Sequence, residues 1–200
     1  MKHENEVRQL LINNTIHLVA TGGFECATTK ELTFCGGSLP DLKMNEIYIY
    51  RLFGGKENLY EQAFLYLDKK LITAFHSGSR FADGFEDNTK KKLYSVFTTA
   101  WKIITNNEES CRYYVRYYYS PYFKGKSQEQ HLKLFEEMIT RLLPIFKDGA
   151  DAVSILHSVF TAMFDFAIRV YNGELENSDD NTAHIFNMLY CMMATYLKNS

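Results

Sequence analysis

Pairs of glycines and three prolines divide this 200-residue sequence into segments of helical length. The glycine pairs stand at residues 22–23, 36–37 and 54–55, and between them apolar side chains recur every three or four residues. An all-β chain of this length needs a turn about every 8–12 residues, and eleven glycines with three prolines are few for that purpose. The sequence therefore predicts an all-α fold.

The breakers predict nine helices. Four of them precede an irregular, polar segment at residues 76–88, and five follow it, so this segment is the expected hinge of the chain. The expected helices cover residues 6–21, 28 to before 36, 46–53, 56–75, 89–105, 108–119, 128–146, 150–171 and 181–198. Pro144 is expected to bend the last turn of the seventh helix.

Polar residues mark the starts of the second and third helices. Thr28 and Glu31 have the spacing of a capping box, in which the Thr28 hydroxyl accepts from the Glu31 N–H and the Glu31 carboxylate accepts from the Thr28 N–H. Asn45 is the expected cap of the third helix. A short capped helix, a turn and a second capped helix predict a helix-turn-helix whose second helix enters the major groove of DNA.

Two sequence motifs around this helix-turn-helix resemble those of the TetR/AcrR family of bacterial transcriptional regulators. Residues 23–32 read GFECATTKEL, similar to the family's G-F-x-x-A-T-T-K-E-I. Residues 49–59 read IYRLFGGKENL, similar to its L-Y-R-Y-F-x-S-K-E-x-L. The resemblance covers about residues 6–65 and implies a DNA-binding domain at residues 1–55, followed by a helical ligand-binding and dimerisation domain at residues 56–200.

The resemblance also implies which residues contact DNA. They are Thr28, Thr29, Asn45, Glu46, Tyr48, Tyr50, Arg51 and Lys56. The two threonines would offer hydroxyl and backbone N–H groups to a phosphate, and the next three residues would face base edges. Tyr50 and Lys56 match positions that hold the DNA backbone, whereas Leu32, Ile49 and Phe53 would form the small core.

Several features depart from the family pattern. Between Glu31 and Phe53 the chain is about six residues longer, so the turn near residues 36–43 is not the usual tight one. Ile47 stands where the family prefers a small residue, and Glu46 places a carboxylate at a reading position. Residues 1–70 carry eight Lys/Arg against nine Asp/Glu, which predicts weak non-specific binding to DNA.

The second part of the chain is expected to hold a hydrophobic or amphipathic small-molecule effector. The whole chain contains 14 Tyr, 15 Phe and seven Met, and the resemblance implies an effector cavity after the hinge. The candidate lining residues are Trp101, Tyr113, Tyr117, Phe135, Met138, Met163 and Phe164. Tyrosine hydroxyls, His131 or Arg116 would supply polar contacts. Each of these residues taken singly is also typical of a packed core, and residues 112–119 read as an amphipathic helix with its arginines in water.

The last two helices carry more apolar residues than one buried face requires. In the family these helices pair with their copies across a two-fold axis, so the resemblance implies a homodimer. The candidate interface residues are Leu156, Val159, Phe160, Phe186, Leu189 and Met193. The alternative is a thicker core within a single chain.

Enzymatic and membrane functions are not predicted. The six histidines form no H-x-x-x-H pair, and the sequence contains no E-x-x-H, P-loop, dinucleotide-binding or G-x-S-x-G motif, so no catalytic residue, metal or cofactor is expected. The polar start, four dispersed cysteines and the lack of a continuous apolar run of ~20 residues predict a cytoplasmic protein that does not enter a membrane.

Two functions remain open at this point. The first is a ligand-responsive regulator, acting as a repressor, that binds double-stranded operator DNA as a homodimer and is released by its effector. The second is a dimeric small-molecule-binding protein whose degenerate helix-turn-helix no longer binds DNA specifically.

Overall fold

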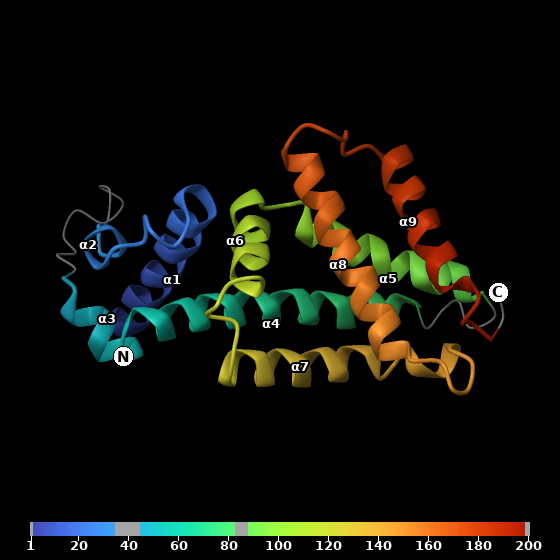
Figure 1. The fold of residues 1–200 in the computed structure, drawn as a ribbon, viewed down its shortest axis with the longest axis horizontal. Coiled ribbons are helices and arrows are strands. Elements are labelled where there is room, and N and C mark those ends of the chain that lie inside the picture. Colours follow the sequence, from blue (N-terminus) through green and yellow to red (C-terminus); the bar gives the residue numbers. More distant parts are fainter. Residues whose placement is uncertain (1, 35–44, 83–87, 199–200) are drawn as a thin grey trace. The chain divides into compact units, whose positions relative to one another are not determined.

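The computed structural model describes residues 2–34, 45–82 and 88–198, and the regular structure in these ranges is helical. The α-helices are α1 (Lys2–Gly22), α2 (Thr29–Leu32), α3 (Ile47–Phe53), α4 (Lys56–Ala82), α5 (Thr89–Ile104), α6 (Glu108–Tyr118), α7 (Lys126–Ile139), α8 (Ala152–Tyr171) and α9 (Asp179–Ala194) (Figure 1). A 3₁₀ helix covers Leu143–Ile145. The predicted all-α fold is confirmed, and the predicted long turn at residues 36–43 lies outside the described residues.

The chain forms two compact units. Unit 1 consists of Met1–Asp68 and Arg112–Gln130, and unit 2 consists of Lys69–Cys111 and His131–Ser200. Three helices, α4, α6 and α7, therefore contribute residues to both units. The predicted boundary at residue 55 divides the chain into a DNA-binding and a ligand-binding part, and this division differs from that into the two compact units. The boundary stays a prediction.

Helix α4 is longer than the sequence indicates. We expected it to end at Phe75, but it continues to Ala82, through most of the segment that was expected to be an irregular hinge. A single glycine inside a helix costs only about 1 kcal/mol. The Ser77 hydroxyl donates to the Thr73 carbonyl at 3.1 Å, so this polar side chain is satisfied within the helix.

Helix α7 is shorter than expected. It ends at Ile139 instead of residue 146, and Pro144 lies in the 3₁₀ helix that follows. The proline ring clashes with the carbonyl four residues earlier, which is that of Thr140, so an α-helix cannot run through this point. Tighter bonds replace it, such as Leu142 N–H to the Ile139 carbonyl at 2.7 Å.

In unit 1, polar side chains of α1 hold the ends of α2 and α3. The Asn14 amide donates to the Leu32 carbonyl at 2.9 Å, and the Arg8 guanidinium donates to the Leu52 carbonyl at 2.8 Å. Both carbonyls lie in the last turn of a helix, where they have no partner within that helix. Leu32, Ile49 and Phe53 are buried between the helices, as the sequence predicts.

Helix α6 is fastened to the rest of unit 1 by side-chain hydrogen bonds. The Tyr113 hydroxyl donates to the Tyr60 carbonyl at 2.7 Å, and the Tyr114 hydroxyl donates to the Asp68 carboxylate at 2.8 Å. The inward tyrosines agree with the predicted amphipathic helix. Arg116, which we expected in water or beside an effector, donates to the Val19 carbonyl at 2.6 Å and so caps the end of α1.

In unit 2, α5, α8 and α9 pack against one another. Helix α8 is long and apolar enough to cross a bilayer by length and composition, which the sequence reasoning did not anticipate. It carries Asp165 and Arg169 on its exposed side, and it buries Leu156, Met163 and Ala167. Helix α8 is thus packed on one side and exposed on the other.

Candidate functional site

The outward face of α3 is formed by Ile47, Tyr50 and Arg51. Their spacing of three and four residues places them on one side of the helix, opposite the buried Ile49 and Phe53. Ile47 is 67% exposed and Tyr50 is 60% exposed. The exposed side of α3 therefore carries two large side chains and one cation, and the opposite side is buried in the core.

The residues just before α3 are exposed and hold its first turn. Helix α3 begins at Ile47 rather than residue 46, and Glu46 occupies the cap position without a side-chain hydrogen bond. The Asn45 side-chain oxygen accepts from the Ile47 N–H at 3.1 Å. Asn45 therefore holds the start of the helix as predicted, although the helix begins one residue later than expected. Asn45 and Glu46 thus remain accessible at the start of the helix.

Tyr48 is less available than the sequence indicates. Its side chain is half-buried, and the Arg51 guanidinium carbon lies 4.7 Å from its ring centroid. Arg51 also lies 4.0 Å from the Glu4 carboxylate of α1. Ile47, which was not among the predicted contacts, is the more accessible side chain, and its position opposite Ile49 and Phe53 is the sequence signal that identifies it.

The start of α2 confirms half of the predicted capping box. The exposed Thr28 hydroxyl accepts from the Glu31 N–H at 3.2 Å. The Thr28 N–H donates to the Cys26 carbonyl at 2.9 Å, so the Glu31 carboxylate does not return to it. The Thr28 N–H is thus already bonded to a backbone carbonyl of the preceding loop. Thr29 is half-buried as the first residue of α2.

The link from α3 to α4 brings Lys56 next to the helix-turn-helix. Gly54 ends α3 with φ +78°, a left-handed conformation in which a side chain is strained. Lys56 begins α4 with its ammonium group 5.8 Å from the Tyr60 ring centroid. Tyr60 in turn donates to the Ala27 carbonyl at 3.1 Å, which ties α4 to the loop before α2.

Unit 1 is electrically balanced. Counted over the full sequence of its two segments, it carries ten Lys/Arg and ten Asp/Glu. Moving α6 into this unit therefore adds cations but leaves no net positive charge. Net charge alone therefore gives unit 1 no long-range attraction to a polyanion.

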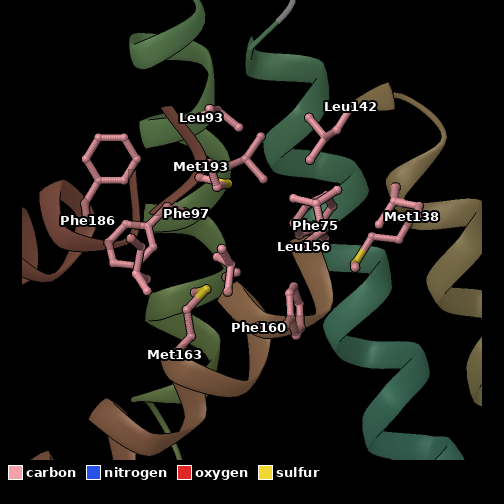
Figure 2. Close-up of a pocket in the computed structure, with 15 residues that line it drawn as sticks. Phe75, Leu93, Phe97, Met138, Leu142, Leu156, Phe160, Met163, Phe186 and Met193 are labelled. Atoms are coloured by element: carbon pink, nitrogen blue, oxygen red, sulfur yellow. The ribbon is translucent and has the colours of Figure 1, made fainter. Parts of the chain in front are cut away.

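Unit 2 contains a partly open cavity of about 40 Å³ (Figure 2). The side chains around it are all apolar and come from α4, α5, α7, α8 and α9 and from Leu142. They are Phe75, Leu93, Val96, Phe97, Ala100, Met138, Ile139, Leu142, Leu156, Val159, Phe160, Met163, Phe186, Leu189 and Met193. A space of this size holds about one water molecule, and its apolar lining offers a water no partner.

Solved structures with a similar arrangement of helices are regulators. A TetR-family transcription regulator from Marinobacter aquaeolei VT8 has a TM-score of 0.75 at 18% identity, covering 96% of this chain and 98% of that one. A TetR-like regulator from Rhodococcus sp. RHA1 has a TM-score of 0.62 at 15% identity, covering 93% and 92%. NalD of Pseudomonas aeruginosa, described as the secondary repressor of the MexAB-OprM multidrug efflux pump, has a TM-score of 0.65 at 14% identity, covering 98% of both chains.

This chain has the TetR fold. No protein-family model matches its sequence, and no curated protein matches it. The similarity therefore rests on the course of the backbone over nearly the whole chain. It agrees with the resemblance seen in the two sequence motifs of the helix-turn-helix.

Within this TetR fold, the predicted ligand-contacting residues separate into two groups. Met138 and Met163 line the cavity, whereas Trp101, Phe135 and Phe164 are buried in unit 2 without lining it. Tyr113 and Tyr117 are buried in unit 1, where their hydroxyls donate to the carbonyls of Tyr60 and Tyr122. The predicted residues are thus buried, but they belong to two different cores, one in each unit.

The two predicted polar residues, Arg116 and His131, are not among the residues that line this cavity. Arg116 belongs to unit 1 and binds the Val19 carbonyl. His131 is buried in unit 2, with its ring 6.2 Å from that of Phe135, and His157 approaches Phe135 at 5.7 Å. Burial, followed by the electrostatic effect of the nearby His131, lowers the pKa of His157 and so disfavours protonation of His157.

The predicted dimer residues face their own chain. Leu156, Val159, Phe160, Phe186, Leu189 and Met193 all line the cavity of unit 2. The outer side of α9 instead exposes Met188 and Met192, at 41% and 51%, followed by Tyr196 beyond the end of the helix. Val153 is exposed near the start of α8. These are the large apolar side chains that remain exposed on α8, on α9 and just beyond α9 in the described part of the chain.

Proposed function

We propose that this protein is a TetR-like transcription regulator that binds double-stranded operator DNA through α3. The observation that carries the proposal is the outward face of α3, which presents Ile47, Tyr50 and Arg51 from a helix held at both ends. Side chains of α1 and α6 brace the surrounding unit through hydrogen bonds of 2.6–2.9 Å. A recognition helix requires such support, because base contacts depend on position within a fraction of an ångström.

The proposed contacts divide by chemistry. Thr28, Thr29, Tyr50 and Lys56 would bind phosphates, since they carry hydroxyls, N–H groups or a cation near the starts of α2 and α4 or on the face of α3. The exposed Asn45 and Glu46 would reach base edges. Arg51 would join them once it leaves Glu4, an exposed ion pair that costs little to open. The proposed DNA-binding domain is residues 1–55.

The proposed dimer forms through the outer sides of α8 and α9. Met188, Met192 and Tyr196 form an apolar strip on and just beyond α9, and Val153 adds apolar surface on α8. A symmetric contact would bury the same strip of both copies against each other. A two-fold axis there would present two recognition helices to half-sites about 34–36 Å apart.

The proposed effector enters the cavity of unit 2 and enlarges it. A cavity of about 40 Å³ is much smaller than the roughly 300–1,000 Å³ of ligand pockets, so side chains must move before an effector fits. Met138, Met163 and Met193 line the space and are unbranched, which makes such movement inexpensive. The lining has no polar side chain, so it favours an apolar effector over an amphipathic one.

The proposed release mechanism acts through α4. This continuous helix contributes Phe75 to the cavity and Lys56 to the helix-turn-helix. An effector that displaces Phe75 would favour a second position of α4 and weaken the DNA-bound state. This coupling requires the effector to bind that second state more tightly than the first.

A gel-shift titration against the region upstream of the gene tests the DNA-binding proposal. Tyr50→Ala and Lys56→Ala should each weaken binding, and Lys56→Ala should reduce the slope of log affinity against log salt by about one. Tyr119→Ala and Lys102→Ala are matched controls, because both side chains are exposed and neither belongs to the helix-turn-helix. The proposal would be overturned if the gel showed no salt-sensitive shift, or a shift that Tyr50→Ala and Lys56→Ala did not weaken.

The balanced charge of unit 1 favours a second candidate, a dimeric binding protein for apolar molecules that has lost specific DNA recognition. Ten cations against ten anions give little electrostatic attraction to a duplex. This candidate predicts no operator binding but retains a dimer by light scattering and a thermal shift with apolar compounds. A monomer at micromolar concentration would contradict both candidates.

A further inference from the structure

Ile47 is the most exposed side chain on the recognition helix and has no obvious role in the fold. It is the first residue of α3, it points away from the buried Ile49 and Phe53, and it is 67% exposed. Its backbone N–H is held by the Asn45 side chain at 3.1 Å. Exposing a branched apolar side chain to water at this point gives no stability to the free protein.

We propose that Ile47 reads the C5-methyl group of a pyrimidine in the major groove, an inference that rests on the proposed DNA binding by α3. The N-terminal residues of a recognition helix are those that contact base edges. Ile47 occupies that first position, and Tyr50 and Arg51 follow one turn behind it. The side chain with the best access to base edges is thus an apolar one.

The chemistry of Ile47 selects one feature of the groove. Its side chain has no hydrogen-bond donor or acceptor, so it cannot distinguish bases by their polar edges. The C5-methyl group of thymine is the apolar group that the major groove presents. A β-branched side chain has one strongly preferred rotamer in a helix, so Ile47 meets this methyl group without losing further side-chain freedom.

5-Methylcytosine presents the same methyl group together with an amino donor. The exposed carboxylate of Glu46, next to Ile47, accepts hydrogen bonds of the kind that a cytosine amino group donates. Thymine offers an acceptor at that edge instead. The shared chemistry is therefore a methylated pyrimidine, and the experiment must separate the thymine from the 5-methylcytosine source.

The test uses the full chain and three randomised duplex libraries. The first contains thymine, the second contains uracil in its place, and the third contains uracil together with 5-methylcytosine. Binding selection on each library is followed by affinity measurement on single selected duplexes in which one methyl group at a time is removed. Losing one contacted methyl group should weaken binding by about fourfold, the value of one buried methyl-sized group.

Variants connect that methyl group to Ile47. Ile47→Ala should bind the methylated and unmethylated duplexes equally well, and Ile47→Val should retain part of the preference. Ile103→Ala is the matched control, because Ile103 is an exposed isoleucine on α5, and it should keep the full preference. Circular dichroism checks that each variant keeps its helical content.

The outcomes test the role of Ile47 separately from the proposed DNA binding on which it rests. A preference for the first library assigns thymine as the target, and a preference for the third assigns 5-methylcytosine. Salt-sensitive binding that is equal on all three libraries would overturn the role of Ile47 and leave DNA binding intact. No binding to any library would overturn both.

Discussion

The hydrogen bond between Tyr114 and Asp68 should be one of the most costly single contacts to remove in unit 1. The hydroxyl and the carboxylate oxygen are 2.8 Å apart, and both residues are buried. Burial, followed by the Asp68 charge, raises the pKa of Tyr114 well above its usual value, so the hydroxyl remains a donor. Hydrogen bonds to charged groups contribute about 1.5–3 kcal/mol, and Tyr114→Phe should lose about that much.

Thermal or urea unfolding at one fixed protein concentration measures this loss. For a chain of this size it corresponds to a fall in Tm of about 3 to 12 °C. Tyr119→Phe is the matched control, because Tyr119 lies just beyond the same helix and is 68% exposed. Its stability should change by less than about 0.5 kcal/mol.

A double-mutant cycle isolates the pair from the other contacts of Asp68. Asp68→Asn alone disturbs every partner of that carboxylate, but the cycle with Tyr114→Phe subtracts the contributions that do not involve the tyrosine. Most of the loss in Tyr114→Phe should appear as coupling energy. If Tyr114→Phe behaves like Tyr119→Phe, the bond does not fasten α6 to α4, and the reasoning on how unit 1 is braced fails.

Three further predictions concern acid stability, assembly and the cap of α2. The pKa of His157 is lowered by burial, so the unfolded chain binds this proton more readily than the folded chain as the pH falls below about 6.5. When Tm is measured against pH, His157→Gln should therefore lose less stability than the wild type between about pH 7 and 5. His184→Gln is the control, because His184 is exposed, and it should match the wild type. Met192→Glu should shift the light-scattering mass toward the monomer, while Lys102→Glu should not; equal masses would remove α9 from the interface. Thr28→Ala should lower stability by about 1 kcal/mol in urea unfolding through loss of its hydrogen bond to the Glu31 N–H, and an unchanged midpoint would show that the cap contributes nothing.

Helix boundaries followed the sequence where a specific residue ends or caps a helix. Gly54 ends α3 in a left-handed conformation, and the Asn88 side chain accepts a hydrogen bond at the start of α5. Other boundaries differ from the prediction: α9 covers Asp179–Ala194 instead of residues 181–198, and its start is capped by the Ser178 side chain. A single glycine at residue 78 did not stop α4, because its cost is small against the packing of a long helix.

The candidate site was harder to predict, because periodicity shows that a face is apolar but not what covers it. Tyr113 and Met138 both lie on apolar stripes, yet one is buried in unit 1 and the other lines the cavity of unit 2. Helix α9 has apolar side chains on two sides, and only packing shows that Leu189 faces inward and Met192 outward. The same limit applies to Ile47, whose exposure becomes clear once Ile49 and Phe53 are placed in the core.

The balanced charge of unit 1 and the exposure of Ile47 lead to one expectation about specificity. A duplex attracts this unit weakly, because ten cations are offset by ten anions, so binding to arbitrary sequences gains little from counterion release. Affinity for an operator should then come from fitted contacts, such as those that we propose for Asn45 and Ile47 with base edges. Such contacts lose about 1–3 kcal/mol with each wrong base pair, whereas the electrostatic background is nearly the same for every sequence. A regulator built in this way should be weak on bulk DNA and unusually sensitive to single base changes in its site.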